Sequence, residues 1–165
     1  MKKLLCLAAL AAVTLGQSFT TQAADVSLSV GQTGDSTMTY RLGLQSNWDA
    51  SWWQTSVGRI TGYWDGDETA SNHSLSFSPV FVYEFAGESV KPYIEAGIGV
   101  AAFSSTELES NELGSSFQFE DRIGFGLRFA GGHEVGVRAI HYSNAGLKMP
   151  NDGVESYSLH YRMPL

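Results

Sequence analysis

Apolar and polar residues alternate with a period of two along nearly the whole chain after residue 24. Successive side chains of a β-strand point to opposite faces, so this alternation predicts strands that each have one apolar face. Neither a long apolar stretch nor a convincing period of 3.6 interrupts the pattern. Seven segments carry it, at residues 26–30, 38–44, 75–85, 90–100, 117–129, 135–139 and 157–163, and residues 52–64, whose parity is mixed, make an eighth expected strand. The chain is therefore expected to be all-β.

The composition of the two faces separates a membrane barrel from a soluble one. A soluble barrel would expose a face rich in lysine and glutamate, whereas the polar face here is rich in glycine and serine and carries charges of both signs. Such a face suits the interior of a barrel whose apolar face meets lipid. We predict an eight-stranded antiparallel transmembrane β-barrel of up-and-down topology, closed so that no strand edge meets hydrocarbon and filled by side chains. The charged residues of its interior are expected to be Arg41, Glu84, Glu95, Arg122, Arg138 and Arg162.

The amino terminus has the order of a secretory signal. Lys2 and Lys3 precede an apolar run over residues 4–15, and small residues follow at Ala23 and Ala24. This order predicts a signal peptide over residues 1–23 and a barrel over residues 24–165. The apolar run is short for a spanning helix, which needs about 20 residues.

Charge and cysteine content exclude several kinds of chemistry. The chain has 10 basic and 17 acidic residues and a formal net charge of −7, so a nucleic-acid partner is not expected. Its single cysteine, Cys6, lies within the predicted signal, so the barrel has no disulfide. His73, His133 and His160 are scattered without the spacing of metal ligands. We therefore expect no metal and no cofactor.

Aromatic residues and connection lengths predict how the barrel sits in a membrane. Seven aromatic residues lie near strand ends, where the girdles of membrane barrels are found: Trp48, Trp52, Trp53, Trp64, Tyr63, Phe103 and Tyr142. The face assignment of residues 52–64 stays open because their parity is mixed, which a bulge would explain. The connections at 32–36, 65–72, 104–115 and 144–153 are mostly the longer ones, and we expect them on the extracellular side.

Polar residues interrupt the outward apolar stripe on the last two strands. On the seventh strand the outward positions continue to His141 and Ser143, and on the eighth they begin at Glu155. A hairpin register that pairs His141 with Glu155 would bring a serine, a histidine and an acid together at the outer rim. These are the residue types of a serine hydrolase, in which the histidine takes the serine proton and the acid orients the imidazole. An oxyanion site could use the Asn151 side chain and a backbone amide between Asn144 and Gly146.

The segment His141-Tyr142-Ser143-Asn144-Ala145-Gly146, followed by Asn151 and Glu155, resembles the carboxy-terminal motif of the PagL family of outer-membrane lipid A 3-O-deacylases. The resemblance implies an esterase of the bacterial outer membrane that hydrolyses the 3-O-linked hydroxyacyl chain of lipid A, in lipopolysaccharide of the outer leaflet, without a metal. It implies Ser143 as nucleophile, His141 as base and Glu155 as orienting acid. Asn144, Asn151 and, through its backbone, Gly146 are implied as oxyanion or site-supporting residues.

Two other functions fit parts of the pattern. A non-enzymatic small outer-membrane barrel with a structural or adhesive role would carry its specificity in long external loops, whereas the predicted loops are modest. A secreted lipocalin-like binder would need a charged outer surface. The oligomeric state is open between a monomer and a homodimer.

Overall fold

The computed structural model describes residues 24–48, 54–69, 73–108 and 110–165. The predicted signal peptide, residues 1–23, lies outside this described part, as do Trp52 and Trp53. No helix among the described residues combines the length and the apolar character needed to cross a membrane.

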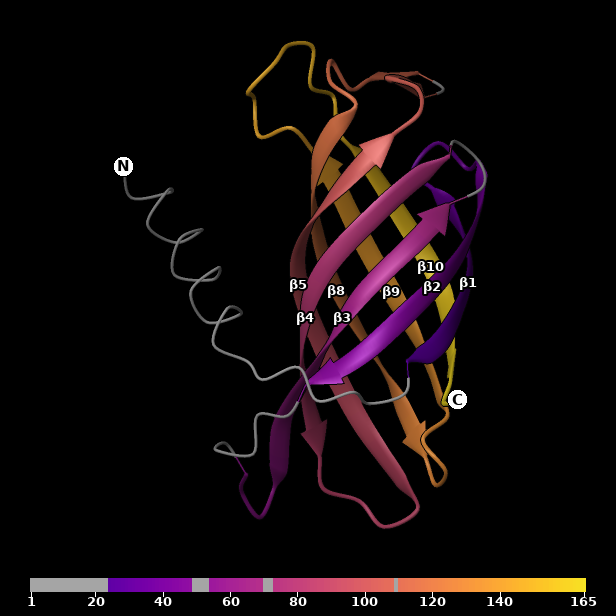
Figure 1. Cartoon of the computed structure of the whole chain (residues 1–165), viewed down its shortest axis with the longest axis vertical. Helices are drawn as coiled ribbons and strands as arrows, with labels where there is room; N and C mark the ends of the chain where they lie inside the picture. The colour runs from indigo at the N-terminus through magenta and orange to yellow at the C-terminus, as the bar shows by residue number, and fades with distance from the viewer. Residues whose placement is uncertain (1–23, 49–53, 70–72, 109) are drawn as a thin grey trace.

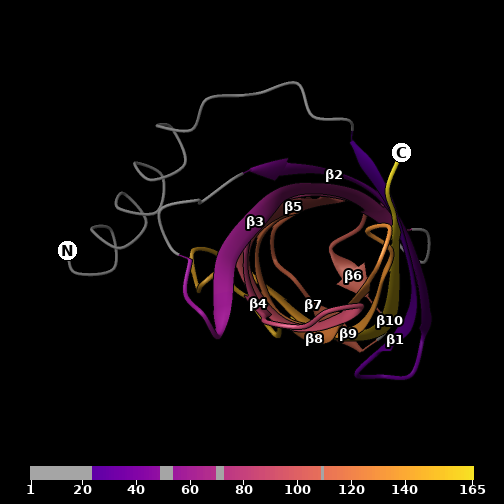
Figure 2. The ribbon, with the colours of Figure 1, turned by 90° about the horizontal axis from the view of Figure 1, so that it is seen from below.

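Eight long strands close into a barrel in which each strand is antiparallel to both of its neighbours, as predicted (Figure 1). The ring runs in the order β1-β10-β9-β8-β5-β4-β3-β2, so consecutive long strands are neighbours and the topology is up-and-down. Viewed along its axis, the ring is continuous, with β6 inside its outline (Figure 2). The strands are β1 (Asp25–Thr33), β2 (Met38–Trp48), β3 (Gly58–Thr69), β4 (Ser74–Phe85), β5 (Val90–Phe103), β6 (Glu107–Leu108), β7 (Asn111–Glu112), β8 (Phe117–Phe129), β9 (Glu134–Ser143) and β10 (Val154–Met163).

The outer wall carries exposed apolar side chains on seven of the eight long strands, all except β3. It consists of the residues that the alternation placed outward, which is the arrangement that a lipid environment favours. Examples that are at least half exposed, taken from six of the strands, are Leu28, Leu42, Leu75, Ile94, Ile123, Phe125 and Leu159.

The interior is a network of buried ion pairs and hydrogen bonds. Arg138 pairs with Glu95 and donates a hydrogen bond of 2.6 Å to the Tyr63 hydroxyl. Arg122 pairs with Asp65 and, at 2.7 Å, with Glu120. His160 is fully buried, and its Nε2 accepts a hydrogen bond of 3.1 Å from Arg138. Charges buried in this way are tolerated because each is paired.

The face assignment that the sequence left open is decided by the ladder of β3. Pairing of β3 with β4 is continuous from Gly58↔Phe85 to Thr69↔Ser74, so no bulge lies between Gly58 and Thr69, contrary to the prediction. The buried side chains of Tyr63 and Asp65 point into the barrel. Parity looked mixed because an aromatic ring occupies an inward position while Gly62 and Gly66 occupy outward ones.

Three of the predicted girdle residues lie inside the barrel instead. Tyr63, Phe103 and Tyr142 are buried, because they fill space between the charged networks and under the loops. Trp64 takes an outward position, where its ring stacks on Phe77 with the ring centroids 5.2 Å apart.

The two ends of the barrel differ in their connections. We call the end that carries residues 34–37, 104–116 and 144–153 the loop end. The opposite end, where β1 begins and β10 ends, is the terminal end (Figure 1). The second connection was predicted to begin at Asp65, but β3 continues to Thr69 and Asp65 is in the interior. Residues 104–116 contain the short β6–β7 hairpin, and Leu113 from this segment is fully buried at the loop end of the core.

Candidate active site

The β9–β10 hairpin carries the predicted site residues on its outer face. Glu155 pairs with His141 in the ladder, as the predicted register required. Their inward neighbours Tyr142 and Val154 are buried, so His141, Ser143 and Glu155 project away from the interior. The outward parity predicted for all three residues is therefore correct.

An acid and an imidazole are joined by a hydrogen bond at this rim. His141 Nδ1 lies 3.0 Å from Glu155 Oε1, and the two side chains are 43% and 51% exposed. Because a carboxylate only accepts, Nδ1 donates this hydrogen bond, and in the neutral form of the ring Nε2 is then an acceptor. An imidazole in this tautomer can remove a proton from a hydroxyl group.

Ser143 is the last residue of β9 and lies two residues from His141 on the same face. Within the described part of the chain, its hydroxyl makes no hydrogen bond, and so none joins it to His141. Contacts between nucleophile and base are often looser without substrate. The structure thus brings the base and the acid into contact and places the serine beside them.

Gly153 leaves room next to the imidazole. Its φ is +75°, which favours glycine, and a Cβ at this position would lie 2.9 Å from His141 Cε1. The same Cβ would lie 3.7 Å from Nε2, the nitrogen that is left as an acceptor. The absence of a side chain at residue 153 therefore keeps this edge of the ring open.

The two asparagines hold the loop that follows Ser143. The Asn144 side chain is 1% exposed and donates hydrogen bonds of 2.8 Å to the Leu113 carbonyl and 2.7 Å to the Lys148 carbonyl. Its backbone N–H donates to Asn151 Oδ1 at 2.9 Å. Both residues support the site by fixing the loop, and the Asn144 N–H is already used.

Two backbone donors of the same loop are free. Ala145 and Gly146 have φ values of +55° and +74°, and the Leu147 N–H closes their turn on the Asn144 carbonyl at 3.0 Å. In the described residues neither the Ala145 nor the Gly146 N–H has an acceptor. Amides of this kind can stabilise an oxyanion.

Asp121 on β8 was missed by the sequence reasoning. It is exposed and pairs with His141 in the ladder, so His141 has an acidic neighbour on each adjoining strand. The signal was present, because Asp121 is an acidic residue at an outward position between the apolar residues Phe119 and Ile123.

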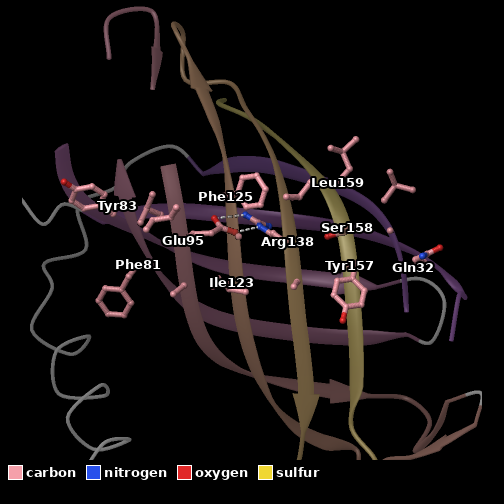
Figure 3. Close-up of a pocket in the computed structure, with 18 of the residues that line it drawn as sticks. Gln32, Phe81, Tyr83, Glu95, Ile123, Phe125, Arg138, Tyr157, Ser158 and Leu159 are labelled. Carbon is pink, nitrogen blue, oxygen red and sulfur yellow. Dashed lines mark hydrogen bonds and ion pairs between the residues drawn. The ribbon is translucent and has the colours of Figure 1, made fainter. Parts of the chain in front are cut away.

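An apolar groove runs from these residues along the outer wall. Its upper part, about 420 Å³, is lined by Asp121, His141 and Glu155 together with Ile98 and Tyr157. A larger part of about 1070 Å³ continues from it across the barrel wall. Phe81, Ile123 and Tyr157 line both parts, and Figure 3 shows the larger one, in which Phe125 and Leu159 are also labelled. The small residues Ala96 and Ala139 are also shared, and they allow the wall to be hollowed between larger side chains.

The closed barrel, its apolar outer wall and its ion-paired interior define an outer-membrane β-barrel with an acid–histidine pair on its lipid-facing surface. A model of the family described as lipid A 3-O-deacylase (PagL) matches residues 38–164. The chain therefore belongs to this family, and the resemblance drawn from residues 141–155 is confirmed.

Individual relatives agree with this assignment. The lipid A deacylase PagL of Pseudomonas aeruginosa is 67% identical over 173 aligned residues, which cover 100% of both chains. A second lipid A deacylase PagL, from Bordetella bronchiseptica, is 38% identical over 122 residues, covering 73% of this chain and 62% of the relative. A crystal structure of the outer membrane enzyme PagL matches with a TM-score of 0.83 and 67% identity, covering 86% of this chain and 100% of that one. The predicted outer-membrane location is thereby confirmed.

Proposed function

We propose that this protein is a serine esterase that hydrolyses the 3-O-linked hydroxyacyl chain of lipid A in outer-leaflet lipopolysaccharide. Ser143 is the nucleophile, His141 the general base and Glu155 the orienting acid. The observation that carries the proposal is the 3.0 Å hydrogen bond between His141 Nδ1 and Glu155 Oε1, on the same face as Ser143. Membership of the lipid A 3-O-deacylase family supports the substrate.

In the reaction His141 accepts and gives back a proton twice. Ser143 Oγ attacks the ester carbonyl while Nε2 takes the hydroxyl proton, and Glu155 stabilises the imidazolium that forms. Collapse of the tetrahedral intermediate breaks the bond to the sugar oxygen, which leaves with the proton from Nε2. A water molecule then attacks the acyl-enzyme, Nε2 accepts its proton, and the fatty acid is released as Ser143 regains its hydrogen.

The position of the site suits a substrate that never leaves the membrane. The groove below His141 is lined mainly by apolar side chains, and such a surface accommodates an acyl chain. The free N–H groups of Ala145 and Gly146, with the Asn151 side chain amide, are the donors available for the oxyanion. With the loop end outside the cell, the ester bond lies at the level of the outer-leaflet head groups.

Replacement of the nucleophile tests this proposal. We expect Ser143→Ala to insert into the outer membrane at the wild-type level and to lose deacylation, because alanine has no hydroxyl group with which to attack the ester. Mass spectrometry of lipid A from cells that express each form measures the loss of one hydroxyacyl chain.

Ser56→Ala is a matched control, because Ser56 is exposed at the terminal end of the barrel. We expect full deacylation from this control. Full activity of Ser143→Ala would remove Ser143 from the mechanism, whereas a lack of deacylation by the wild-type protein would favour the alternative of a non-enzymatic barrel.

A further inference from the structure

The cations of this protein are distributed unevenly. Of its 10 lysines and arginines, two lie in the predicted signal peptide. Four are buried in the interior, namely Arg41, Arg122, Arg138 and Arg162. Three lie at the terminal end, namely Arg59, Lys91 and Arg128. The remaining one is Lys148, in the loop that follows Ser143. Among the described residues, Lys148 is therefore the single lysine or arginine that is exposed at the loop end.

The surroundings of Lys148 are acidic. Asp35, Glu107, Glu112 and Asp152 are exposed on the loop-end connections, and Asp121 and Glu155 flank His141. An anionic lipid that approaches such a rim is repelled by like charges. The ammonium group of Lys148 is thus the positive charge that the rim offers to an anionic lipid. Within the described residues, Lys148 forms no ion pair.

The backbone of Lys148 is held close to the candidate site. Both backbone groups of Lys148 bond to the Asn144 side chain, the carbonyl at 2.7 Å and the N–H at 3.3 Å, and Asn144 directly follows Ser143. Asn144 is in turn tied to the Leu113 carbonyl of the neighbouring loop. At the other end of the loop, the Glu112 N–H donates to the Asp152 side chain at 2.9 Å. The loop is thereby fixed at both ends.

Two exposed apolar side chains flank this lysine. Leu147 is 75% exposed and Met149 is 74% exposed. A cation between two apolar side chains suits the boundary between lipid head groups and acyl chains. The tip formed by Leu147, Lys148 and Met149 is thus suited to bind a phosphorylated lipid beside the candidate site.

We propose that this tip recognises the head group of the substrate, with the Lys148 ammonium group bound to a phosphate of the same lipid A molecule whose ester bond lies at Ser143. This inference rests on the proposed function for the identity of the lipid. Lys148 acts in binding and positioning and takes no part in proton transfer.

The test compares two substrates in neutral detergent micelles, where no surrounding anionic lipid is present. One is lipid A with its phosphates, and the other is the same lipid after chemical dephosphorylation. An exposed lysine near an anionic group contributes about fivefold in affinity. We expect the wild-type KM to be about fivefold lower for the phosphorylated lipid, Lys148→Gln to abolish this preference, and Lys148→Arg to retain it.

Lys91→Gln is the control, because Lys91 is a half-buried lysine at the terminal end, where it pairs with Glu84 at 3.4 Å. It should retain the wild-type preference. The proposal is overturned if wild-type protein shows no preference, if Lys148→Gln retains it, or if Lys91→Gln loses it equally.

Binding to the Ser143→Ala protein separates this inference from the proposed function, because no turnover is needed. We expect the Kd for phosphorylated lipid A to rise about fivefold when Lys148→Gln is added to Ser143→Ala. An unchanged Kd overturns the role of Lys148 even in an active enzyme. A raised Kd supports it even if Ser143 proves not to be the nucleophile.

Discussion

The imidazole of His141 lies between two carboxylates, and only one of them is hydrogen-bonded to it. Glu155 on β10 accepts from Nδ1, whereas Asp121 occupies the paired position on β8. The hydrogen bond is the reason for giving the proposed orienting role to Glu155. The position of Asp121 makes it the natural competitor for that role.

Replacement of Glu155 should be less damaging than replacement of the nucleophile. We expect both Glu155→Ala and Ser143→Ala to lower kcat, and the kcat that remains to be about a hundredfold higher in Glu155→Ala. The reason is that an orienting acid contributes less than the group that attacks. Single-turnover assays on purified protein measure both losses. A greater loss in Asp121→Asn than in Glu155→Ala would transfer the orienting role to Asp121.

Gly153 is expected to be sensitive because of its distance to the imidazole. In Gly153→Ala the added methyl group would lie 2.9 Å from His141 Cε1, so the ring must move away from its present position. We expect kcat to fall by at least about tenfold, since small misplacements of catalytic groups have large effects on rate.

Gly131→Ala separates this effect from backbone strain. Gly131 also has a positive φ, of +88°, but its nearest neighbour would be 3.8 Å from the new Cβ and it lies at the terminal end. Equal losses of kcat in the two variants would attribute the effect of Gly153→Ala to strain and not to the imidazole.

At the scale of elements, each strand separates a lipid-facing row from an interior row. On β10, Leu159 points outward and is exposed, while its neighbours Ser158 and His160 are buried. Leu159 also lies near the middle of the strand. A substitution of Leu159 therefore tests whether the outer wall contacts hydrocarbon.

A charge on this row should destabilise the inserted barrel. We expect Leu159→Arg to lower the free energy of unfolding by about 2–4 kcal/mol, the cost of arginine near the bilayer midplane. Urea unfolding in lipid vesicles measures it. Leu165→Arg, beyond the end of β10, should cost about 0–1 kcal/mol. Equal costs at residues 159 and 165 would contradict the assigned depth.

The loop end also depends on contacts between elements that are distant in the chain. Leu113, from the connection between β5 and β8, packs in a cluster with Phe103, Tyr142 and Val154. The same segment accepts the Asn144 hydrogen bond through the Leu113 carbonyl. The connection over residues 104–116 thus supports the loop that borders Ser143.

At the scale of the whole molecule, the barrel has to cross one membrane before it inserts into another. We expect removal of residues 1–23 during export, because small residues follow the apolar run at Ala23 and Ala24. The intact mass of protein purified from outer membranes should correspond to a chain that begins at Ala24. A mass that includes residues 1–23 would contradict the predicted cleavage.

The whole barrel is stabilised from the inside by its ion pairs. Arg122 and Arg138 contact carboxylates from other strands, Asp65 on β3 and Glu95 on β5. These contacts tie together strands that are not all neighbours. The paired charges inside are consistent with a barrel filled by side chains, as its strand number predicted.

The amino-acid sequence by itself determined the fold class and the two faces of most strands, and it suggested the pairing of His141 with Glu155 that the structure shows. Lipid outside and paired charges inside impose an alternation of apolar and polar residues, which can be seen in each short segment of the sequence. A hairpin register likewise depends on residues that are close in the chain. Only the tertiary structure decided that Asp121 lies beside His141, that Tyr63 and Tyr142 fill the interior, and that Leu113 supports the active-site loop. These relations depend on the stagger between strands and on contacts between distant loops, because a one-dimensional alternation says which way a side chain points but not which neighbour it meets.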